Sequence, residues 1–447
     1  MKIKEHIDPT TLRITDMRFA DIVDAPKRCT LMKIMTNQGI EGYGEVRDAA
    51  SKTYALMLKS RIIGENPCNV DKLFRKIKQF GNHSRQGGGV SGIEIALWDI
   101  VGKVYQIPLY QLLGGKYRDA IRLYCDTDVE GRHDGLEMGK ALKERMEMGF
   151  TFLKMDLGIG MLLSKEGMLT APLGLLEEMQ KYAPHVLNAQ GGSVTADMVS
   201  HQKSYALATT AHPFTGIHIT EKGLDYLEAY VRDVRSFIGY DIPLAVDHFG
   251  HVCVEDGIRF ARRMEKYNLA WIEDMVPWIY TDQYRRLKDS TTVPICTGED
   301  IYLAENFKPL LNEHAVSIIH PDILTCGGAS ELKRIADMAD EQGIAVAIHM
   351  AESPIACLAA VHVAAALHNV LALEFHSVDI PWWKDMVLGL DEPLIQNGFI
   401  RVPEAPGLGI EALNDPVLQA HINPKIPGLW ESTDEWNQEF SNDRLWS

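Results

Sequence analysis

Through the second half of the chain, short apolar runs alternate with polar residues at a nearly constant interval. Runs such as IPLAV, LAWI and IAVAI each end in an acid or a histidine. The residues at these ends are Asp247, Glu273, Glu299, Asp322, His349 and Glu374. By subtraction of positions, the steps between them are 26, 26, 23, 27 and 25 residues. A repeat of this length holds one strand, one helix and two turns, which is the unit of a parallel (β/α)8 TIM barrel. We therefore predict an α/β barrel enzyme with catalytic groups at the carboxyl ends of its strands.

The first part of the chain has a different pattern. Residues 12–46 read as strands, with a hairpin-type turn at Asn37-Gln38-Gly39 between apolar runs. From about residue 53 to 113 the apolar positions take helical spacing. A block of strands followed by a block of helices forms a layer of its own. We predict an N-terminal α+β domain over residues 1–122.

Strands and helices begin to alternate at the start of the predicted barrel domain, residues 123–387. Its second strand ends at Asp156 and its third at Asp247, a gap of 91 residues by subtraction, whereas one barrel unit needs only about 30. We predict an insertion at about 158–220, which serves as a lid, as an oligomer contact or as a plain surface embellishment. Residues 388–447 are rich in Pro, Gly and Trp, and we expect them to pack back on the N-terminal domain.

The net charge of the chain limits the kinds of molecule that it is expected to bind. The 447-residue chain has 45 Lys and Arg against 61 Asp and Glu, a formal net charge of −16 at pH 7. Without a basic excess, binding to nucleic acid or to an anionic membrane is disfavoured. An anionic small molecule would need a locally positive site, such as a metal ion. We expect a small-molecule carboxylate substrate and a homo-oligomeric assembly.

The cysteines and the apolar stretches indicate the compartment. The seven cysteines are widely spaced and include no CxxC pair, so we interpret them as reduced thiols. The N-terminal MKIKEHIDPTTL has no apolar core of a signal peptide. The most apolar stretch, residues 355–375, contains His362 and His368, as expected for a buried helix and strand rather than a membrane span. These features predict a cytoplasmic protein.

Asp247, Glu273 and Glu299 follow three successive predicted strands. Carboxylates on adjacent parallel strands repel one another unless a cation lies among them. Hard oxygen ligands favour Mg²⁺, with Mn²⁺ as the second choice. The alternative is that each acid caps the helix after it. A single acid would fit a cap better, but three at this spacing favour a metal site.

Asp322 and His349 follow the next two strands. An imidazole held by a neighbouring carboxylate has a fixed tautomer and a raised pKa, so it can act as a general acid or base near neutral pH. A core histidine with satisfied hydrogen bonds is the alternative. Glu374, after the last strand, is expected to donate a hydrogen bond to a substrate carboxylate when protonated, or to cap a helix.

Lys154 and Asp156 end the second predicted strand and, by strand alternation, face the same side. Lys154 can bind the carboxylate of a substrate or, with a lowered pKa, act as a base. A purely structural ion pair between the two residues is the alternative.

These residues, together with GGGVSGIEIALWDIVGKVYQIPLYQLLGG at 87–115, resemble the mandelate racemase subgroup of the enolase superfamily. The resemblance covers nearly the whole chain. It implies that Mg²⁺ binds the substrate carboxylate and stabilises the enediolate left when the α-proton is removed, and that the N-terminal domain caps the barrel mouth. It also implies that Arg85 and His83, on capping loops, hold the distal hydroxyls of the substrate. Many members of the subgroup dehydrate acid sugars.

Two positions depart from the family pattern. Racemases of the subgroup carry Lys-x-Lys on the second strand, and Asp156 stands here in place of the second lysine. This replacement disfavours racemisation, which needs acid–base groups on both faces of the enediolate. Mannonate dehydratases place a catalytic histidine two residues after the metal aspartate, where this chain has Phe249. His248, beside that position, is a candidate for substrate binding.

We therefore predict a hydro-lyase that dehydrates an aldonate or aldarate to a 2-keto-3-deoxy acid with the help of Mg²⁺. His349 would help to expel the β-hydroxyl, and Lys154 or Asp156 would take or orient the α-proton. A racemase, epimerase or cycloisomerase is the alternative within the family. A non-catalytic barrel that binds sugar acids is the alternative of another class, and the presence of every predicted ligand and dyad residue disfavours it.

Overall fold

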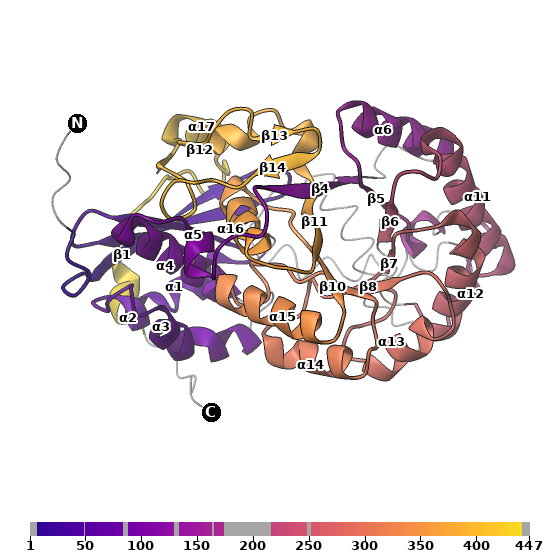
Figure 1. The fold of residues 1–447 in the computed structure, drawn as a ribbon, viewed down its shortest axis with the longest axis horizontal. Coiled ribbons are helices and arrows are strands. Elements are labelled where there is room, and N and C mark those ends of the chain that lie inside the picture. The colour runs from indigo at the N-terminus through magenta and orange to yellow at the C-terminus, as the bar shows by residue number, and fades with distance from the viewer. Residues whose placement is uncertain are drawn as a thin grey trace. The chain divides into compact units, whose positions relative to one another are not determined.

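The computed structural model describes residues 7–48, 50–83, 88–128, 134–162, 165–173, 216–247 and 252–439, with the backbone alone of residues 82 and 83 (Figure 1). Three predicted substrate-binding side chains lie outside this description, namely those of His83, Arg85 and His248. Residues 174–215, most of the predicted insertion, also lie outside it. The roles assigned to these residues stay predictions.

Eight strands form the barrel that the repeat predicts (Figure 1). They are β4 (Ala120–Thr127), β5 (Leu153–Asp156), β6 (Leu244–Asp247), β7 (Ile272–Glu273), β8 (Ile295–Thr297), β9 (Ile318–Ile319), β10 (Ala345–Ile348) and β11 (Val370–Phe375). Each strand is hydrogen-bonded to the next in this order, and β11 also pairs with β4, which closes the ring. Neighbouring strands run parallel, with Asp156 beside Asp247 in the register of β5 and β6. The predicted (β/α)8 TIM fold is confirmed.

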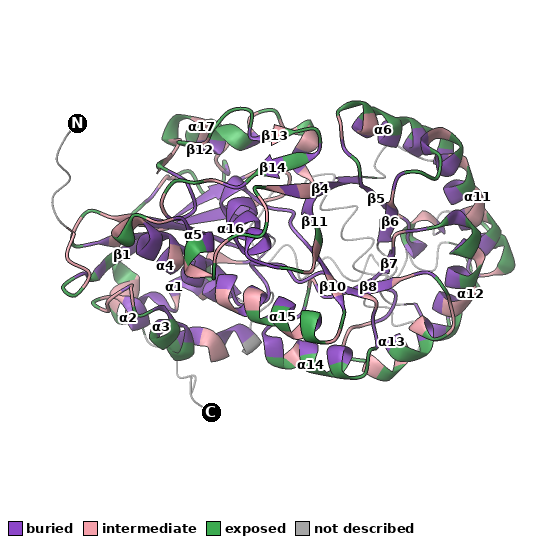
Figure 2. Cartoon of the chain, in the orientation of Figure 1, coloured by how far each residue is buried: buried purple, intermediate pink, exposed green. Residues whose placement is uncertain are grey.

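Helices follow the strands along the chain. They are α6 (Gly135–Glu147), α11 (Glu221–Ile238), α12 (Val254–Met264), α13 (Thr281–Lys288), α14 (Ala304–Asn312), α15 (Ala329–Glu341) and α16 (Pro354–Ala365). Most of them bury one face and expose the other, as α12 and α13 do in Figure 2. All 12 residues of α16 are buried, so the apolar stretch 355–375 is a buried helix followed by a strand. Among the described residues, no helix is both long and apolar enough to cross a membrane.

The chain divides into two compact units. The first comprises Met1–Leu123, Glu299–Lys308 and His320–Ser447, and the second comprises Tyr124–Gly298 and Pro309–Ile319. Strands β10 and β11 belong to the first unit, whereas β5 to β9 belong to the second. The domain boundaries expected near residues 122 and 387 stay predictions.

The N-terminal part of the first unit is a three-stranded antiparallel sheet with helices. Its strands, in the order β1-β2-β3, are β1 (Ile14–Ile22), β2 (Cys29–Thr36) and β3 (Glu41–Val46). The helices are α1 (Lys52–Leu56), α2 (Lys59–Ile62), α3 (Val70–Ile77), α4 (Val90–Tyr105) and α5 (Leu109–Leu112). Gly39 has a φ of +74°, which the predicted turn between β2 and β3 requires. A Cβ on Gly44 would lie 2.1 Å from the carbonyl oxygen of Gly92, so glycine is needed where β3 meets α4.

The C-terminal segment packs within the same unit. It contains β12 (Val387–Leu388), β13 (Ile395–Gln396), β14 (Phe399–Arg401), β15 (Ala412–Leu413) and α17 (Asp415–Ala420). The backbone N–H of Asn423 donates to the carbonyl of Asp21 at 2.8 Å, and that of Trp430 donates to Phe19 at 3.2 Å. The segment therefore contacts β1 of the N-terminal sheet.

Candidate active site

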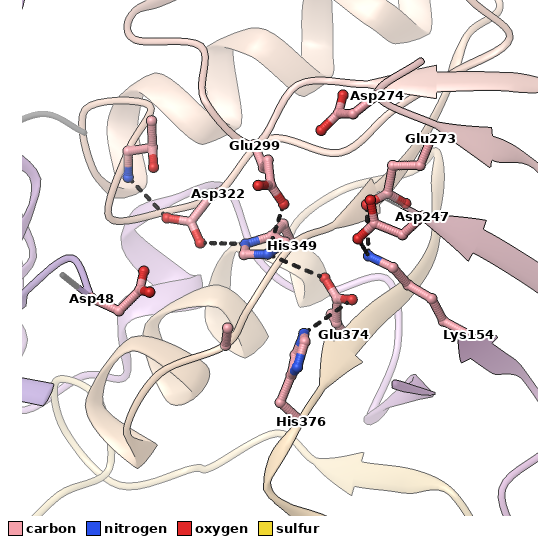
Figure 3. Close-up of polar contacts among 12 residues, drawn as sticks. Asp48, Lys154, Asp247, Glu273, Asp274, Glu299, Asp322, His349, Glu374 and His376 are labelled. Atoms are coloured by element: carbon pink, nitrogen blue, oxygen red, sulfur yellow. Dashed lines mark hydrogen bonds and ion pairs between the residues drawn. The ribbon is translucent and has the colours of Figure 1, made fainter. Parts of the chain in front are cut away.

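Lys154 of β5 lies between the carboxylates of Asp247 and Glu273 in the second unit (Figure 3). Its Nζ is 2.8 Å from Asp247 Oδ2 and 2.6 Å from Glu273 Oε1. Both Lys154 and Glu273 are fully buried, so their attraction is weakly screened by water. The indole N–H of Trp271 donates to Glu273 Oε2 at 2.6 Å. These contacts hold the carboxylates at the ends of β6 and β7 in fixed orientations.

The two acids do not cap the helices that follow them. The N-cap positions of α12 and α13 are Cys253 and Tyr280. Asp247 and Glu273 lie several residues before these positions, at the strand ends. The helix-cap alternative therefore does not apply to either acid.

Asp274 adds a third carboxylate to this cluster. Oxygen atoms of Asp247, Glu273 and Asp274 lie within 4.8 Å of one another. Strand alternation would turn Asp274 away from Glu273, but its φ of 50° is left-handed and interrupts the extended backbone. The hydroxyl of Thr297 donates to Asp274 Oδ1 at 2.5 Å. Three converging carboxylates against one ammonium suit a hard divalent cation, so these residues fit Mg²⁺ or Mn²⁺.

His349 is the centre of a second cluster, in the first unit (Figure 3). Its Nδ1 is 2.8 Å from Asp322 Oδ2, and its Nε2 is 2.9 Å from Glu299 Oε2. Nε2 also lies 3.6 Å from Glu374 Oε2. The other oxygen of Glu374 is 3.2 Å from Nε2 of His376. Carboxylates on both edges of the imidazole favour a proton on each ring nitrogen.

The surroundings of His349 set its protonation. Burial lowers the pKa of His349, but the negative charges of Glu299 and Glu374 and the hydrogen bond to Asp322 raise it by more, so that the pKa lies well above its ordinary value. Arg47 opposes this rise because it is also positive. This setting favours the protonated form of His349, which can act as a proton donor.

Asp322 has two roles at once. Its Oδ1 accepts hydrogen bonds from the backbone N–H groups of Leu324 at 2.7 Å and Thr325 at 2.9 Å, which fix the turn after β9. Its Oδ2 contacts His349. One oxygen of Asp322 therefore fixes the turn while the other contacts His349.

Arg47, just after β3, is a site residue that the sequence reasoning missed. Its guanidinium is buried and forms ion pairs with Asp322, with Glu352 at 3.0 Å and with Asp48 at 2.8 Å. Its NH1 also lies 3.0 Å from His349 Nδ1. Arg47 therefore neutralises the carboxylate that holds His349. It follows an N-terminal strand outside the barrel repeat, so no spacing pattern indicates it.

The predicted site residues thus fall into two sets. Asp247, Glu273, Lys154 and Asp156 belong to the second unit, and Glu299, Asp322, His349 and Glu374 belong to the first. Asp156 is partly buried. The catalytic and metal-binding roles of these residues stay predictions, and the structure adds Asp274, Arg47, Glu352 and His376 to the candidates.

Family models match both predicted parts of the chain. Residues 8–114 match the N-terminal domain of the mandelate racemase / muconate lactonizing enzyme family, and residues 137–415 match the enolase C-terminal domain-like family. The chain belongs to the enolase superfamily. The resemblance inferred from the strand-end residues is confirmed for this enolase-superfamily protein.

Individual relatives cover nearly the full chain. D-xylonate dehydratase from Haloferax volcanii is 33% identical over 433 residues, which are 94% of this chain and 92% of the relative. D-galactonate dehydratase from Ralstonia pickettii is 28% identical over 400 residues, 86% of this chain and 89% of the relative. The crystal structure of a mandelate racemase/muconate lactonizing enzyme-like protein from Rubrobacter xylanophilus has a TM-score of 0.75 and 29% identity, and the match covers 93% of this chain and 99% of that one.

Proposed function

We propose that this enolase-superfamily protein is a hydro-lyase that dehydrates a sugar acid to a 2-keto-3-deoxy acid. The observation that carries the proposal is the setting of His349, whose two ring nitrogens lie against the carboxylates of Asp322 and Glu299. A buried imidazolium suits a reaction in which a hydroxyl must be protonated to leave as water. The similarity to proteins named D-xylonate dehydratase and D-galactonate dehydratase supports the same chemistry.

The proton balance of the reaction assigns the remaining groups. The C–H bond next to the substrate carboxylate and the C–O bond on the neighbouring carbon both break. Nε2 of His349 gives its proton to the departing hydroxyl, water leaves, and the enol product becomes the 2-keto acid. The α-proton passes to Asp156 or Lys154 at the end of β5. Two carboxylates within 2.8 Å of Lys154 favour its charged form, so Asp156 is the preferred acceptor and Lys154 orients the substrate carboxylate.

Asp247, Glu273 and Asp274 are the residues that would hold Mg²⁺ or Mn²⁺, with Glu299 as a further predicted ligand. When bound, the ion supplies positive charge for the negative charge that develops on the substrate carboxylate. Lys154 adds a fixed positive charge from β5, which is important because the chain as a whole carries a net charge of −16. Together these groups explain how such an acidic protein attracts a carboxylate.

The test is a screen of five- and six-carbon aldonic and aldaric acids with Mg²⁺, beginning with D-xylonate and D-galactonate. We expect 2-keto acid formation from at least one of them. The matched variant is His349→Asn, whose amide can still donate to Asp322 but cannot donate a proton to a leaving group, so turnover should fall by at least about 100-fold. α-Proton exchange in D₂O without 2-keto acid would indicate an isomerase instead. Absence of both reactions across the screen would refute catalysis of this class.

A further inference from the structure

A further group of potential ligands, none of them a residue of the proposed reaction, lies in the second unit. It consists of His218, Cys253 and Asp256. His218 lies just before α11, in the segment where Ile219 forms a β-bridge with Leu169. Cys253 is the N-cap residue of α12, and Asp256 lies in the first turn of that helix. The group therefore joins the chain entering α11 to the beginning of α12.

The three ligand atoms converge on one point. Nδ1 of His218 is 3.3 Å from Cys253 Sγ and 3.3 Å from Asp256 Oδ2, and all three atoms lie within 4.8 Å of one another. A tetrahedral Zn²⁺ ion with ligand bonds of about 2.0–2.3 Å separates its sulfur, nitrogen and oxygen ligands by about 3.3–3.6 Å. The separations of His218 Nδ1 from the other two ligand atoms lie at the lower end of this range.

When Nδ1 of His218 is protonated, it can donate to Asp256 Oδ2, and the Cys253 thiol hydrogen-bonds to Asp256 as well. The three side chains therefore form one hydrogen-bonded group, in which a cation would take the place of the protons.

The surrounding groups orient the carboxylate for this role. Asp256 Oδ2 accepts a hydrogen bond from the backbone N–H of Ile219 at 2.9 Å, which leaves one lone pair directed at His218. Asp256 Oδ1 accepts from Arg259 NH1 at 3.0 Å. Such partners fix the orientation of a metal-binding carboxylate. Cys253 and Asp256 are buried, whereas the side chain of His218 is 46% exposed, so an ion can enter from solvent and keep a water ligand.

We propose that His218, Cys253 and Asp256 bind Zn²⁺, with a water molecule in the fourth position. Sulfur and imidazole ligands select this softer ion, whereas the all-oxygen cluster around Asp247 suits Mg²⁺. Binding releases the thiol proton of Cys253 to solvent. The ion cross-links the segment before α11 to α12 and takes no part in the proposed dehydration.

The test uses cobalt as a probe in the full-length reduced protein, with excess Mg²⁺ present to occupy the carboxylate cluster. Co²⁺ bound to a thiolate gives a sulfur-to-cobalt charge-transfer absorption in the near ultraviolet, which oxygen ligands cannot give. We expect one equivalent of Co²⁺ to produce this band and Zn²⁺ to displace it. Cys253→Ser should abolish the band, and His218→Ala should weaken Zn²⁺ binding by at least about 100-fold.

Two control variants separate this site from other groups. His368 and Asp340 form a pair with a similar Nδ1–oxygen distance of 3.2 Å, and no third potential ligand among the described residues joins them. His368→Ala should leave the band and the Zn²⁺ affinity unchanged. Cys296, on β8, belongs to a different group of potential ligands, with Glu273 and His320, so Cys296→Ser should also keep the band.

A wild-type protein without the band, or a Cys253→Ser variant that retains it, would overturn the proposal and leave a simple ion pair between His218 and Asp256. Circular dichroism of each variant checks that it is folded. If Cys253→Ser does not fold, the exposed His218→Ala decides the question: Zn²⁺ affinity equal to that of wild type would refute the site.

Discussion

Arg47→Met tests whether the N-terminal layer supplies the charge that holds the proposed dyad of Asp322 and His349. The substitution keeps the apolar length of the side chain and removes its charge. Asp322 and Glu352, two of the three acidic partners of the guanidinium, have 0% exposure. Loss of one partner of a buried ion pair typically costs about 3–5 kcal/mol. Burial and the charge of Asp322 raise the pKa of Glu352 well above its ordinary value, so Glu352 can take up a proton and reduce the cost. We expect a loss of about 3 kcal/mol in the free energy of unfolding.

The assay is a double-mutant cycle with Glu352→Gln, followed by urea unfolding and steady-state kinetics. If the cost comes from an uncompensated carboxylate, Glu352→Gln should recover about 1–2 kcal/mol in the Arg47→Met background. Turnover should not recover, because Asp322 still lacks its counter-charge. We expect kcat to fall by about 100-fold in Arg47→Met and in the double variant, while KM changes little. The reason is that Arg47 positions the dyad through Asp322.

The exposed ion pair of Arg286 with Glu255, at 2.7 Å, supplies the control. Arg286→Met should change the free energy of unfolding by less than about 1 kcal/mol, as for other surface pairs. The reasoning fails if Arg47→Met is as mild as Arg286→Met, or if its kcat equals that of wild type.

Three further predictions concern Lys154, removal of the metal ion and Glu94. Lys154→Met should abolish turnover. Because the variant has no ammonium to repel the ion, Mg²⁺ should raise its melting temperature by more than it raises that of the wild type. Equal shifts for the two proteins in differential scanning fluorimetry would contradict this. EDTA should abolish 2-keto acid formation in the wild type, and Mg²⁺ should restore it in a coupled assay. Burial raises the pKa of Glu94 from its ordinary 4.5 to about 7, although hydrogen bonds from Ser330, Ala329 and Trp98 lower it in part. The stabilising contribution of neutral Glu94 is therefore complete below about pH 4.5 and lost by about pH 7, a change of about 3 kcal/mol. Glu94→Gln should remove this part of the pH dependence of urea unfolding, and parallel profiles for wild type and variant would show that Glu94 titrates normally.

The strand-end residues could be predicted because a barrel repeats in sequence and its geometry gathers the ends of its strands. Asp322 and His349 are 27 residues apart by position, yet their side chains meet at 2.8 Å. Each successive strand brings one more residue to the same edge, so the period alone identifies candidates. The sequence did not indicate that Asp322 also fixes the turn after β9, where its second oxygen accepts from two backbone N–H groups.

Other site residues could not be predicted, for physical reasons that differ from one to the next. Arg47 meets His349 across 302 positions of sequence, and only the packing of the first unit brings them together. Asp274 would face away from Glu273 in a regular strand, and the strand spacing does not predict its left-handed backbone. The group of His218, Cys253 and Asp256 has no motif spacing, because its members come from two separate segments.

The ion pair between Arg47 and Asp322 also has a consequence for recombination among relatives. The N-terminal family match ends at residue 114 and the C-terminal one begins at residue 137, which suggests two modules that could be exchanged. However, the first module contributes the guanidinium that neutralises an aspartate in the second. A chimera that takes its N-terminal module from a relative without this arginine would contain a complete barrel. In that barrel, Asp322 beside His349 would lack its positive partner. A functional exchange of modules would therefore require an N-terminal module that supplies an arginine at this position.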